Sequence, residues 1–424
     1  MLGIIDLLLI CLITVVYAWV FYNLPILAVG VWNLVKSKFE GQDVTSRRVL
    51  PSVSVILPVK NEEKVVGRFF KMFSKIAYPA DKLELIVVED SSADRTFQIC
   101  ERFASTHENV KVLQRSFSSG KPSALNYALK HAEGEIVAVF DADSVPDRDA
   151  LLRVAKYFDA ASVAAVQGRT LSINSSENML TQFLSYEEAV WFEAYLRGKD
   201  ALGLFVHLKG SCQFIRRSVL EKLGGFDEAF LADDMEISAR LTEKDYEIKY
   251  ASDVRSWQES PANLKSLFRQ RTRWFRGTME VAFKYGRLIS KMSRKRLDAE
   301  ATLFGPFILV ASLLSYLAAS GAFFVAFPFD VFWCGLLYFS VFTTTLMLLV
   351  CGFGLIYVSK PKRFRNLLWL PFVFSYFCLQ SFIAMYAALL ILLRRPQRWL
   401  KTEKHGVVTS PVFASEKEIV YEGS

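Results

Sequence analysis

Two aspartates at alternate positions follow an apolar run in Phe140-Asp141-Ala142-Asp143, and this pattern suits a cation site. Residues i and i+2 of an extended segment point to the same side, so the carboxylates of Asp141 and Asp143 can reach one hard cation. Such a cation keeps some water ligands and takes phosphate oxygens as the others. The pattern therefore predicts a site for a metal ion and a diphosphate.

Two further acidic groups stand in the same relation to apolar runs. Glu62 closely follows the run at 53–57, and Glu89 and Asp90 follow the run at 85–88. A single acidic residue after a strand is most often a helix cap. Three such groups at successive strand ends instead indicate a site at one edge of a sheet.

Two other candidate groups each have a structural alternative. Lys121, in Gly120-Lys121-Pro122, is the candidate for contacting phosphate, because the chain has no GxxxxGK loop. The alternative is a loop lysine before a helix. Asp234, which follows Asp233, opens a predicted helix that runs to about residue 242. An acid at a helix start is usually a cap, so either a structural or a chemical role is open for this pair.

The stretch around Gln270-Arg271-Thr272-Arg273-Trp274 separates apolar and basic residues onto two faces. The apolar face comprises Leu264, Leu267, Phe268, Phe275 and Met279, and the basic face comprises Arg269, Arg271, Arg273 and Arg276. This periodicity predicts an amphipathic helix that lies along a membrane surface. The alternative is anchoring at the interface alone, with Trp274 at headgroup level.

Short β-branched runs alternate with helical stretches between residues 52 and 167, and these elements must position the candidate groups. The predicted strands are 53–57, 85–88, 110–113, 136–140 and 163–167. The predicted helices are 62–76, 94–105, 123–132 and 149–159, and the second and fourth open with an aspartate cap. This alternation favours a doubly wound, mostly parallel α/β sheet. Such sheets bind ligands at the carboxyl ends of their strands, where the acidic groups lie.

Apolar windows outside this region predict membrane spans. The chain of 424 residues is 52% hydrophobic and 14% aromatic, which is too apolar for a soluble protein. No Asp, Glu, Lys or Arg occurs in the windows 7–35, 301–329, 331–359 and 366–393. Each exceeds the roughly 20 residues that cross a bilayer core, and the first is too long for a cleaved signal peptide. Basic residues after the first window predict an outside N-terminus and a cytosolic domain.

The charge and the cysteines exclude several other classes of protein. The net charge is +8, and basic residues gather next to the apolar windows, at 284–296, 360–365 and 394–404. Membrane lipids with anionic headgroups explain that placement better than nucleic acid does, so no nucleic-acid partner is expected. The six cysteines show no CxxC spacing, which indicates reduced thiols and no zinc site.

Taken in order, these motifs resemble those of the membrane-embedded family 2 glycosyltransferases, which include cellulose, chitin, hyaluronan and poly-N-acetylglucosamine synthases. The resemblance rests on Asp90, Asp141-Ala142-Asp143, Asp234 and Gln270-x-x-Arg273-Trp274, and it covers residues 52–284 with the flanking windows. It implies a GT-A fold, that is, a Rossmann-like nucleotide-diphospho-sugar transferase domain in the cytosol with flanking transmembrane helices. Ceramide glucosyltransferases have the same motif order, so the acceptor stays open.

The resemblance also implies a role for each motif. Asp90 and Glu89 would face the uracil and ribose of a nucleotide sugar, with UDP-glucose or UDP-N-acetylglucosamine expected. Asp143, helped by Asp141, would bind Mg²⁺ or Mn²⁺ on the diphosphate. Asp234 would be the general base that deprotonates the acceptor hydroxyl. The other implied substrate-binding residues are Glu62 and Asp233, Lys121, Gln270 and Arg273 on the diphosphate, and Trp274 on the acceptor sugar.

Two positions depart from the family pattern without losing a carboxylate. Glu89 stands where the family often has aspartate, and Ala232-Asp233 replaces Thr-Glu before the base. A single base with no second carboxylate nucleophile predicts one in-line displacement. Transfer would therefore invert the anomeric carbon, so an α-linked donor would give a β-linked product.

The tail segment Arg398-Trp399-Leu400-Lys401-Thr402-Glu403-Lys404 is similar to the gating-loop signature of these synthases, which closes over the nucleotide. In that interpretation Trp399, Thr402 and Lys404 contact the substrate, and an interface anchor is the alternative. Three full spans after a cytosolic domain would place this basic tail outside. One C-terminal window is therefore predicted to be re-entrant or in-plane, and window 366–393, with Pro371, is the first candidate.

The predicted organisation has five parts: an anchor at 1–36, a GT-A domain at 50–260, interface helices at 261–299, a membrane region at 300–393 and a cytosolic tail at 394–424. The leading hypothesis is a processive β-glycosyltransferase that extends a polysaccharide or oligosaccharide at the cell membrane. The second is transfer of one sugar to a polyprenyl phosphate or ceramide-like lipid. The third, a non-catalytic transport or scaffold subunit, is disfavoured by the complete carboxylate set.

Overall fold

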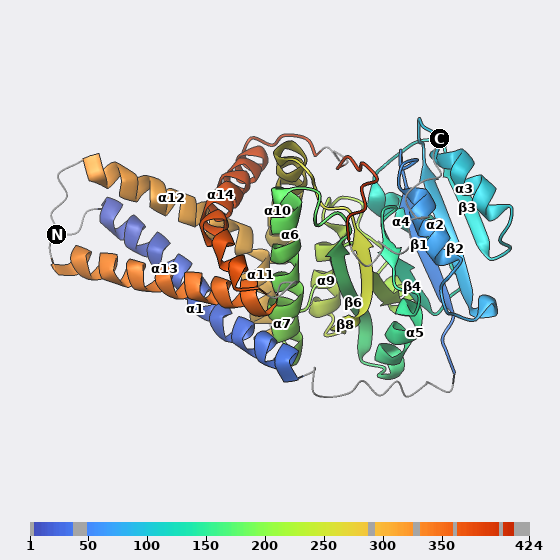
Figure 1. Ribbon diagram of the computed structural model, residues 1–424, viewed down its shortest axis with the longest axis horizontal. Coiled ribbons are helices and arrows are strands. Elements are labelled where there is room, and N and C mark those ends of the chain that lie inside the picture. Colours follow the sequence, from blue (N-terminus) through green and yellow to red (C-terminus); the bar gives the residue numbers. More distant parts are fainter. Residues whose placement is uncertain are drawn as a thin grey trace.

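The computed structural model describes residues 4–36, 49–286, 293–324, 331–358, 363–397 and 402–410. An α/β domain lies at one end of an elongated molecule, and the long helices α1 (Ile4–Lys36), α12 (Gly305–Phe324) and α13 (Val331–Tyr357) extend from the other end (Figure 1). Helix α14 (Leu370–Leu392) stands between these two parts and packs on α10 (Leu264–Tyr285). The site residues predicted from the sequence belong to the α/β domain, to α10 and to the tail.

The domain is built on one eight-stranded sheet in the order β3-β2-β1-β4-β7-β6-β8-β5. The strands are β1 (Val53–Val59), β2 (Leu83–Asp90), β3 (Val110–Arg115), β4 (Ile136–Val139), β5 (Val145–Pro146), β6 (Val163–Ser172), β7 (Gln213–Arg216) and β8 (Glu247–Gln258). Strands β1 to β4 pair in parallel, as predicted. The other half differs, because β7 is antiparallel to β4 and β6, β5 is antiparallel to β8, and β6 and β8 are parallel. The sheet is therefore mixed.

Both faces of the sheet are covered by helices, which explains the continuous apolar runs of the strands. In β1, Val55 and Leu57 pack into one apolar layer, whereas Ile56 packs into the opposite one. The first layer lies under α2 (Val66–Phe73), α3 (Thr96–Ala104) and α5 (Ala150–Ala155). The second lies under α4 (Lys121–Leu129), α8 (Arg217–Lys222) and α9 (Asp233–Glu243).

All the elements predicted between residues 52 and 167 are present, and the differences lie at their ends. Helix α2 begins at Val66 instead of residue 62, because Asn61 has a φ of 53° and the Glu62 carbonyl accepts the Val66 amide in a turn. Helix α4 begins at Lys121, two residues early. Asp149 was predicted to cap α5, but its side chain makes no capping hydrogen bond and instead pairs with Arg153 at 2.5 Å.

Three strands, the two-residue β5 and the longer β7 and β8, were not predicted. Charged residues interrupt β8 at Lys249, Asp253 and Arg255, so its twelve residues do not read as an apolar run. They are accommodated by ion pairs at its rim, such as Lys249 with Glu247 at 2.7 Å. Strand β8 nevertheless matters for the site, because it ends next to Glu259.

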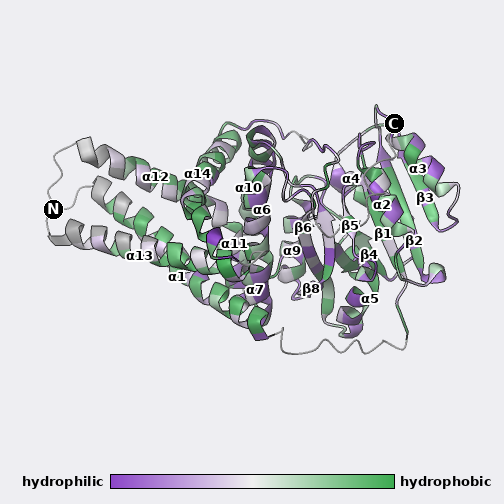
Figure 2. Ribbon diagram, viewed as in Figure 1, coloured by the Kyte–Doolittle hydropathy of each residue, from purple (hydrophilic) through white to green (hydrophobic). Residues whose placement is uncertain are grey.

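Two helices, Ile10–Lys36 and Phe364–Leu392, are long and apolar enough to span a membrane. Helices Arg294–Leu303 and Gly305–Ala318 meet at 51° and would make a third candidate as one bent span, and Thr345–Tyr357 is a shorter apolar helix. Figure 2 shows the apolar character of this region next to the mixed colours of the domain. The window 366–393 holds most of the 3-10 helix η5 (Phe364–Trp369) followed by α14, which together make one candidate span. The sharp bend lies between α11 (Arg294–Leu303) and α12.

Close packing joins α1 to the helical layer of the domain, which is formed by α6 (Met179–Val190), the π-helix η3 (Trp191–Leu196) and α7 (Arg197–Ala201). A Cβ on Gly198 would lie 2.0 Å from the backbone oxygen of Ile26, so only glycine permits this contact. Lys199 and Asp298 form a fully buried ion pair at 3.0 Å, and Tyr22 of α1 donates to Asp298 at 2.7 Å. The apolar helix is therefore fastened to the domain by specific polar contacts.

Candidate active site

The carboxyl ends of the parallel strands bring acidic residues to one edge of the sheet, as predicted. Glu89-Asp90 ends β2, Asp141-Ala142-Asp143 follows β4, and Asp233-Asp234 begins α9. Burial lowers the pKa of Arg273, on α10, while Asp141, Asp233 and Asp234 act in the opposite direction. This guanidinium is therefore within electrostatic reach of all three carboxylates.

Lys121 lies among these carboxylates. Its ammonium donates to Asp141 at 2.6 Å and to the carbonyl of Gly210 at 2.7 Å. Burial alone would lower the pKa of Lys121, but Asp141 and Asp233 raise it above its ordinary value. Gly210 has a φ of 73°, and a Cβ there would lie 3.3 Å from the Asp234 carboxylate. The structure thus places Lys121 in the acidic cluster and not in a plain surface loop.

Asp233 and Asp234 are neighbouring acids with raised pKa values. Burial is the main cause for both, and repulsion from Asp234 helps to raise the pKa of Asp233 to about 7 although Lys121 opposes the shift. The pKa of Asp234 is also raised by burial, although the Met235 amide, which donates to it at 2.8 Å, and the Lys121 and Lys209 ammoniums favour its charged form. Both acids therefore hold protons more tightly than exposed aspartates do, which suits proton acceptance near neutral pH.

Asp143 is buried and lies against the C-terminal tail. Its carboxylate is 2.6 Å from the Lys404 ammonium and accepts the backbone amide of Glu259 at 2.9 Å. Burial alone would raise the pKa of Asp143, but Lys404 holds it below its ordinary value. A lysine of the tail therefore supplies the positive charge at the carboxylate that was predicted to bind a metal ion.

Glu259 holds the tail in this position. Its carboxylate accepts the amides of His405 at 2.6 Å and Gly406 at 3.0 Å, and its carbonyl accepts the Lys404 ammonium at 2.7 Å. Arg68, which is buried like Glu259, pairs with the same carboxylate at 3.2 Å. Thr402 is buried next to this segment in the chain, whereas Trp399 lies outside the described residues.

The residues that were predicted to contact the nucleoside, Glu89 and Asp90, make an ion pair and a hydrogen bond within the protein. Asp90 is 2.9 Å from Arg115, and Glu89 accepts the Ser92 amide at 2.5 Å. Glu62 lies in the turn after β1, where its carbonyl accepts amides at the start of α2. Their proposed contacts with substrate stay predictions.

The arginines of α10 differ from the prediction of a membrane-facing basic surface. Arg271 pairs with Glu187 of α6 at 2.5 Å, and buried Arg276 donates to the carbonyl of Arg395 at 2.6 Å. Arg273 faces the acidic cluster. Three of the four arginines on this face therefore interact with the protein, and they join α10 to the domain and to the chain beyond α14.

Trp274, predicted to stack on an acceptor sugar, carries two cations over its ring. The guanidinium carbon of Arg271 lies 4.4 Å from the ring centroid and the ammonium of Lys209 lies 5.4 Å from it. Gln270 is partly buried on the same helix, and its side chain makes no hydrogen bond with the part of the chain that the structure describes. Its contact with diphosphate stays a prediction.

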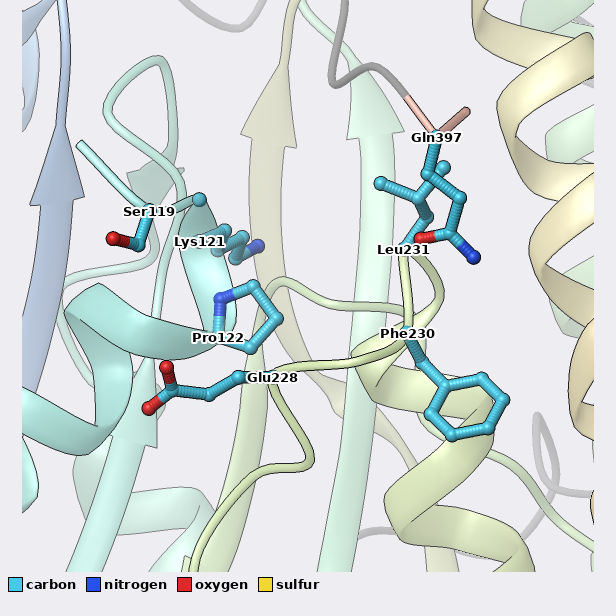
Figure 3. Close-up of a pocket in the computed structure, with 8 residues that line it drawn as sticks. Ser119, Lys121, Pro122, Glu228, Phe230, Leu231 and Gln397 are labelled. Carbon is cyan, nitrogen blue, oxygen red and sulfur yellow. The ribbon is translucent and has the colours of Figure 1, made fainter. Parts of the chain in front are cut away.

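A pocket of about 260 Å³ opens beside Lys121. Figure 3 shows Lys121 and Pro122 of α4 on one side of it and Leu231 and Gln397 on the other. Phe230 and Glu228 of the loop before α9 complete the wall (Figure 3). Of the candidate site residues, Lys121 lines this pocket, whereas Asp141, Asp143, Asp233 and Asp234 do not.

The donor atoms suit a divalent cation together with a phosphate ligand. Among residues 4–410, outside the undescribed gaps, no group of three or more His, Cys, Asp or Glu side chains is arranged to hold a metal ion by itself. Asp143 and Asp141 offer two hard oxygen donors, and Mg²⁺ commonly takes only one or two carboxylates and completes its shell with phosphate and water. The residues present therefore fit a metal diphosphate.

Sequence reasoning missed several residues of the site, among them Glu259, Arg68 and Lys209. Glu259 follows β8 as Asp141 follows β4, so the strand-end rule would have found it if β8 had been predicted. Arg68 and Lys209 have no such signal, because their places depend on long-range packing.

The fold and this site define a class of enzyme. Residues 51–277 match the sequence profile described as glycosyltransferase like family 2, and the chain belongs to this family. It is therefore a glycosyltransferase with a GT-A-like domain, as the resemblance implied. The fold is shared with a mannosyltransferase from Pyrobaculum calidifontis in complex with GDP-Man and Mn²⁺, with a TM-score of 0.60 and 23% identity over 91% of this chain and 100% of that one.

Several curated proteins are similar in sequence. "Probable glycosyltransferase YdaM" of Bacillus subtilis is 28% identical over 84% of this chain and 87% of its own length. Beta-monoglucosyldiacylglycerol synthase of Nostoc is 35% identical over 57% of this chain, a match that spans 52% of that enzyme. Poly-beta-1,6-N-acetyl-D-glucosamine synthase of Staphylococcus epidermidis is 26% identical over 76% of this chain and 79% of its own length. The relatives include β-glycosyltransferases that make polysaccharides or glycolipids.

Proposed function

We propose that this chain is an inverting β-glycosyltransferase that transfers sugar from a UDP sugar to a growing carbohydrate at the cytosolic face of the cell membrane. The observation that carries the proposal is the convergence of Lys121, Arg273 and Asp234 with Asp141-Ala142-Asp143 at one edge of the sheet. UDP-glucose and UDP-N-acetylglucosamine are the expected donors, because the names of two relatives include glucosyl and N-acetylglucosamine products.

In the proposed reaction Asp234 accepts the proton of the acceptor hydroxyl as the oxygen attacks the anomeric carbon. The bond from that carbon to the diphosphate oxygen breaks on the opposite face, so the configuration inverts. Lys121 and Arg273 stabilise the negative charge that develops on the leaving diphosphate. Mg²⁺ or Mn²⁺ held by Asp143 and Asp141 would neutralise the same charge, and Mn²⁺ accompanies GDP-Man in the Pyrobaculum mannosyltransferase.

The tail is proposed to be the lid of the nucleotide site. Lys404 pairs with Asp143 in this structure, and its ammonium would move to the diphosphate when a nucleotide enters. Thr402 and Trp399 would close over the nucleotide with it. The contacts of Glu259 with His405 and Gly406 support a tail that belongs to the site.

Processive extension is supported by the poly-N-acetylglucosamine synthase relative, whose match continues well beyond the family 2 domain to 76% of this chain. A second candidate is transfer of one glucose to a diacylglycerol-like lipid. It is favoured by the higher identity, 35%, to the monoglucosyldiacylglycerol synthase, although that match is shorter.

The test uses the full chain purified in detergent with radiolabelled UDP-glucose and UDP-N-acetylglucosamine, each offered with chitopentaose and with dioleoylglycerol micelles. The products are sized by gel electrophoresis and thin-layer chromatography. A ladder of lengthening oligosaccharides supports processive extension, and a single labelled lipid supports the second candidate. Absence of transfer from both donors to both acceptors, with bound UDP detected by calorimetry, would contradict the proposed function.

A further inference from the structure

Lys209 lies in the active site without a charged partner. It follows the buried segment 205–208 and precedes Gly210, whose carbonyl binds Lys121. Its backbone amide donates to the side chain of Gln167 at 2.8 Å, and that glutamine is fully buried. The position of Lys209 is therefore held by the sheet, independently of its side chain.

The Lys209 ammonium rests on aromatic rings. It lies 4.2 Å from the ring centroid of Trp191, 5.1 Å from that of Phe192 and 5.4 Å from that of Trp274. Cation–π contacts stabilise an ammonium but use none of its three N–H donors in ordinary hydrogen bonds. Within the described part of the chain, Lys209 has neither an ion pair nor a hydrogen bond from its ammonium.

The carboxylates around Lys209 have other partners. Glu187 binds Arg271 at 2.5 Å and Tyr376 at 2.9 Å, and Glu188 accepts the hydroxyl of Thr170 at 2.9 Å. Asp234 is near enough to influence the ammonium electrostatically, and one of its oxygens accepts the Met235 amide. The side chain of Lys209 is only partly buried, so a ligand or water can take the N–H donors that the rings leave unused. Those donors lie near Trp274, the proposed acceptor platform, and within electrostatic reach of Asp234, the proposed base.

We propose that Lys209 is an acceptor-binding residue, whose ammonium donates hydrogen bonds to hydroxyl oxygens of the acceptor while Trp274 and Trp191 form the wall beside it. This inference rests on the proposed function, because Asp234 defines where the acceptor lies. Lys209 would bind the acceptor, whereas Lys121 would bind the nucleotide sugar. Gly210 follows Lys209 in the chain and lies close to both Asp234 and Lys121. The ligand class is a polyhydroxylated or glycerol-bearing acceptor, whose oxygens accept hydrogen bonds from a cation.

The test compares Lys209→Met and Lys209→Arg with the wild type. Methionine keeps an apolar chain of similar length against the aromatic rings but removes the charge, and arginine restores a cation. Lys249→Met is the matched control. Lys249 is a partly buried lysine near the start of β8, whereas Glu259 of the candidate site follows the end of this strand. Transfer of labelled sugar to chitopentaose and to dioleoylglycerol, hydrolysis of the donor to free sugar, and UDP affinity are all measured on the same preparations.

K209M should raise the acceptor KM at least tenfold and increase the share of donor that is hydrolysed, with UDP affinity within twofold of wild type. K209R should recover most of the loss, and K249M should match the wild type. An acceptor KM within twofold of wild type in K209M overturns the inference. So does an equal loss of UDP affinity and transfer together with a lower melting temperature, because that pattern indicates packing alone. Donor hydrolysis that persists in Asp143→Asn with the wild-type rate would instead count against the proposed function.

Discussion

Asp234 and Asp233 are adjacent residues with different environments, and single substitutions separate their roles. Asp234→Asn should abolish transfer and leave nucleotide binding nearly intact, because the amide keeps the shape but cannot accept the proton of the acceptor hydroxyl. Turnover and UDP affinity are measured together, with Asp227→Asn as a control whose carboxylate pairs with Lys284 at 2.6 Å. If D234N kept more than about a tenth of wild-type turnover, another group would have to be the base.

Asp233 should make stability depend on pH. Burial and its acidic neighbours raise the pKa of Asp233 to about 7 in the folded protein, from 3.8. Because the pKa of Asp233 is higher in the folded state than in the unfolded state, its protonated form favours folding. This contribution to stability is fully present below about pH 4 and is lost as the pH rises through 7. Above that pH the wild type carries a buried charge that Asp233→Asn lacks.

The melting temperature of D233N relative to wild type should therefore rise by a few degrees between pH 5.5 and pH 8.5. Differential scanning fluorimetry in detergent measures both proteins at both pH values. A constant difference across this range would mean that Asp233 titrates as an exposed aspartate does.

At the scale of elements, the parallel half of the sheet and the acidic strand ends could be predicted because local signals specify them. Strands that are apolar at every position, such as β4, are buried on both faces and can be predicted without knowledge of their neighbours. Strand β8 could not be found that way, because charged residues interrupt it and the partner of Asp253, Lys156, is distant in sequence. Glu259 and Lys209 were missed for the same reason, because their contacts are with residues distant in sequence.

The tail gives a prediction at the same scale. Lys404→Met should lower turnover more than tenfold, because a charge-assisted hydrogen bond to the diphosphate contributes about 1.5 to 3 kcal/mol. The matched control is Glu403→Gln, a neighbouring residue whose side chain is exposed. Truncation before Trp399 should have at least the same effect without unfolding the domain, as circular dichroism would report. Full turnover of the truncated chain would leave the tail as an interface anchor only.

At the scale of the whole molecule, the tail and Asp143 must share one side of the membrane, because Lys404 is 2.6 Å from Asp143. A cysteine at the exposed position Glu403, in a Cys11→Ser background, should resist an impermeant thiol reagent added to intact cells and react after permeabilisation. Ser410 is a poorer site, since it is only 7% exposed. Labelling of Glu403→Cys in intact cells would place the tail and the domain outside and contradict the predicted cytosolic orientation.

The configuration of the transferred sugar tests the central claim most directly. Wild-type protein is incubated with α-linked UDP-glucose or UDP-N-acetylglucosamine and the acceptor it uses, and proton NMR of the purified product reports the new anomeric centre. A single base at Asp234, acting in one displacement, predicts a β-linkage from the first detectable product, and no product from D234N. An α-linkage would require retention of configuration and would contradict the assignment of Asp234 as the base of an inverting transferase.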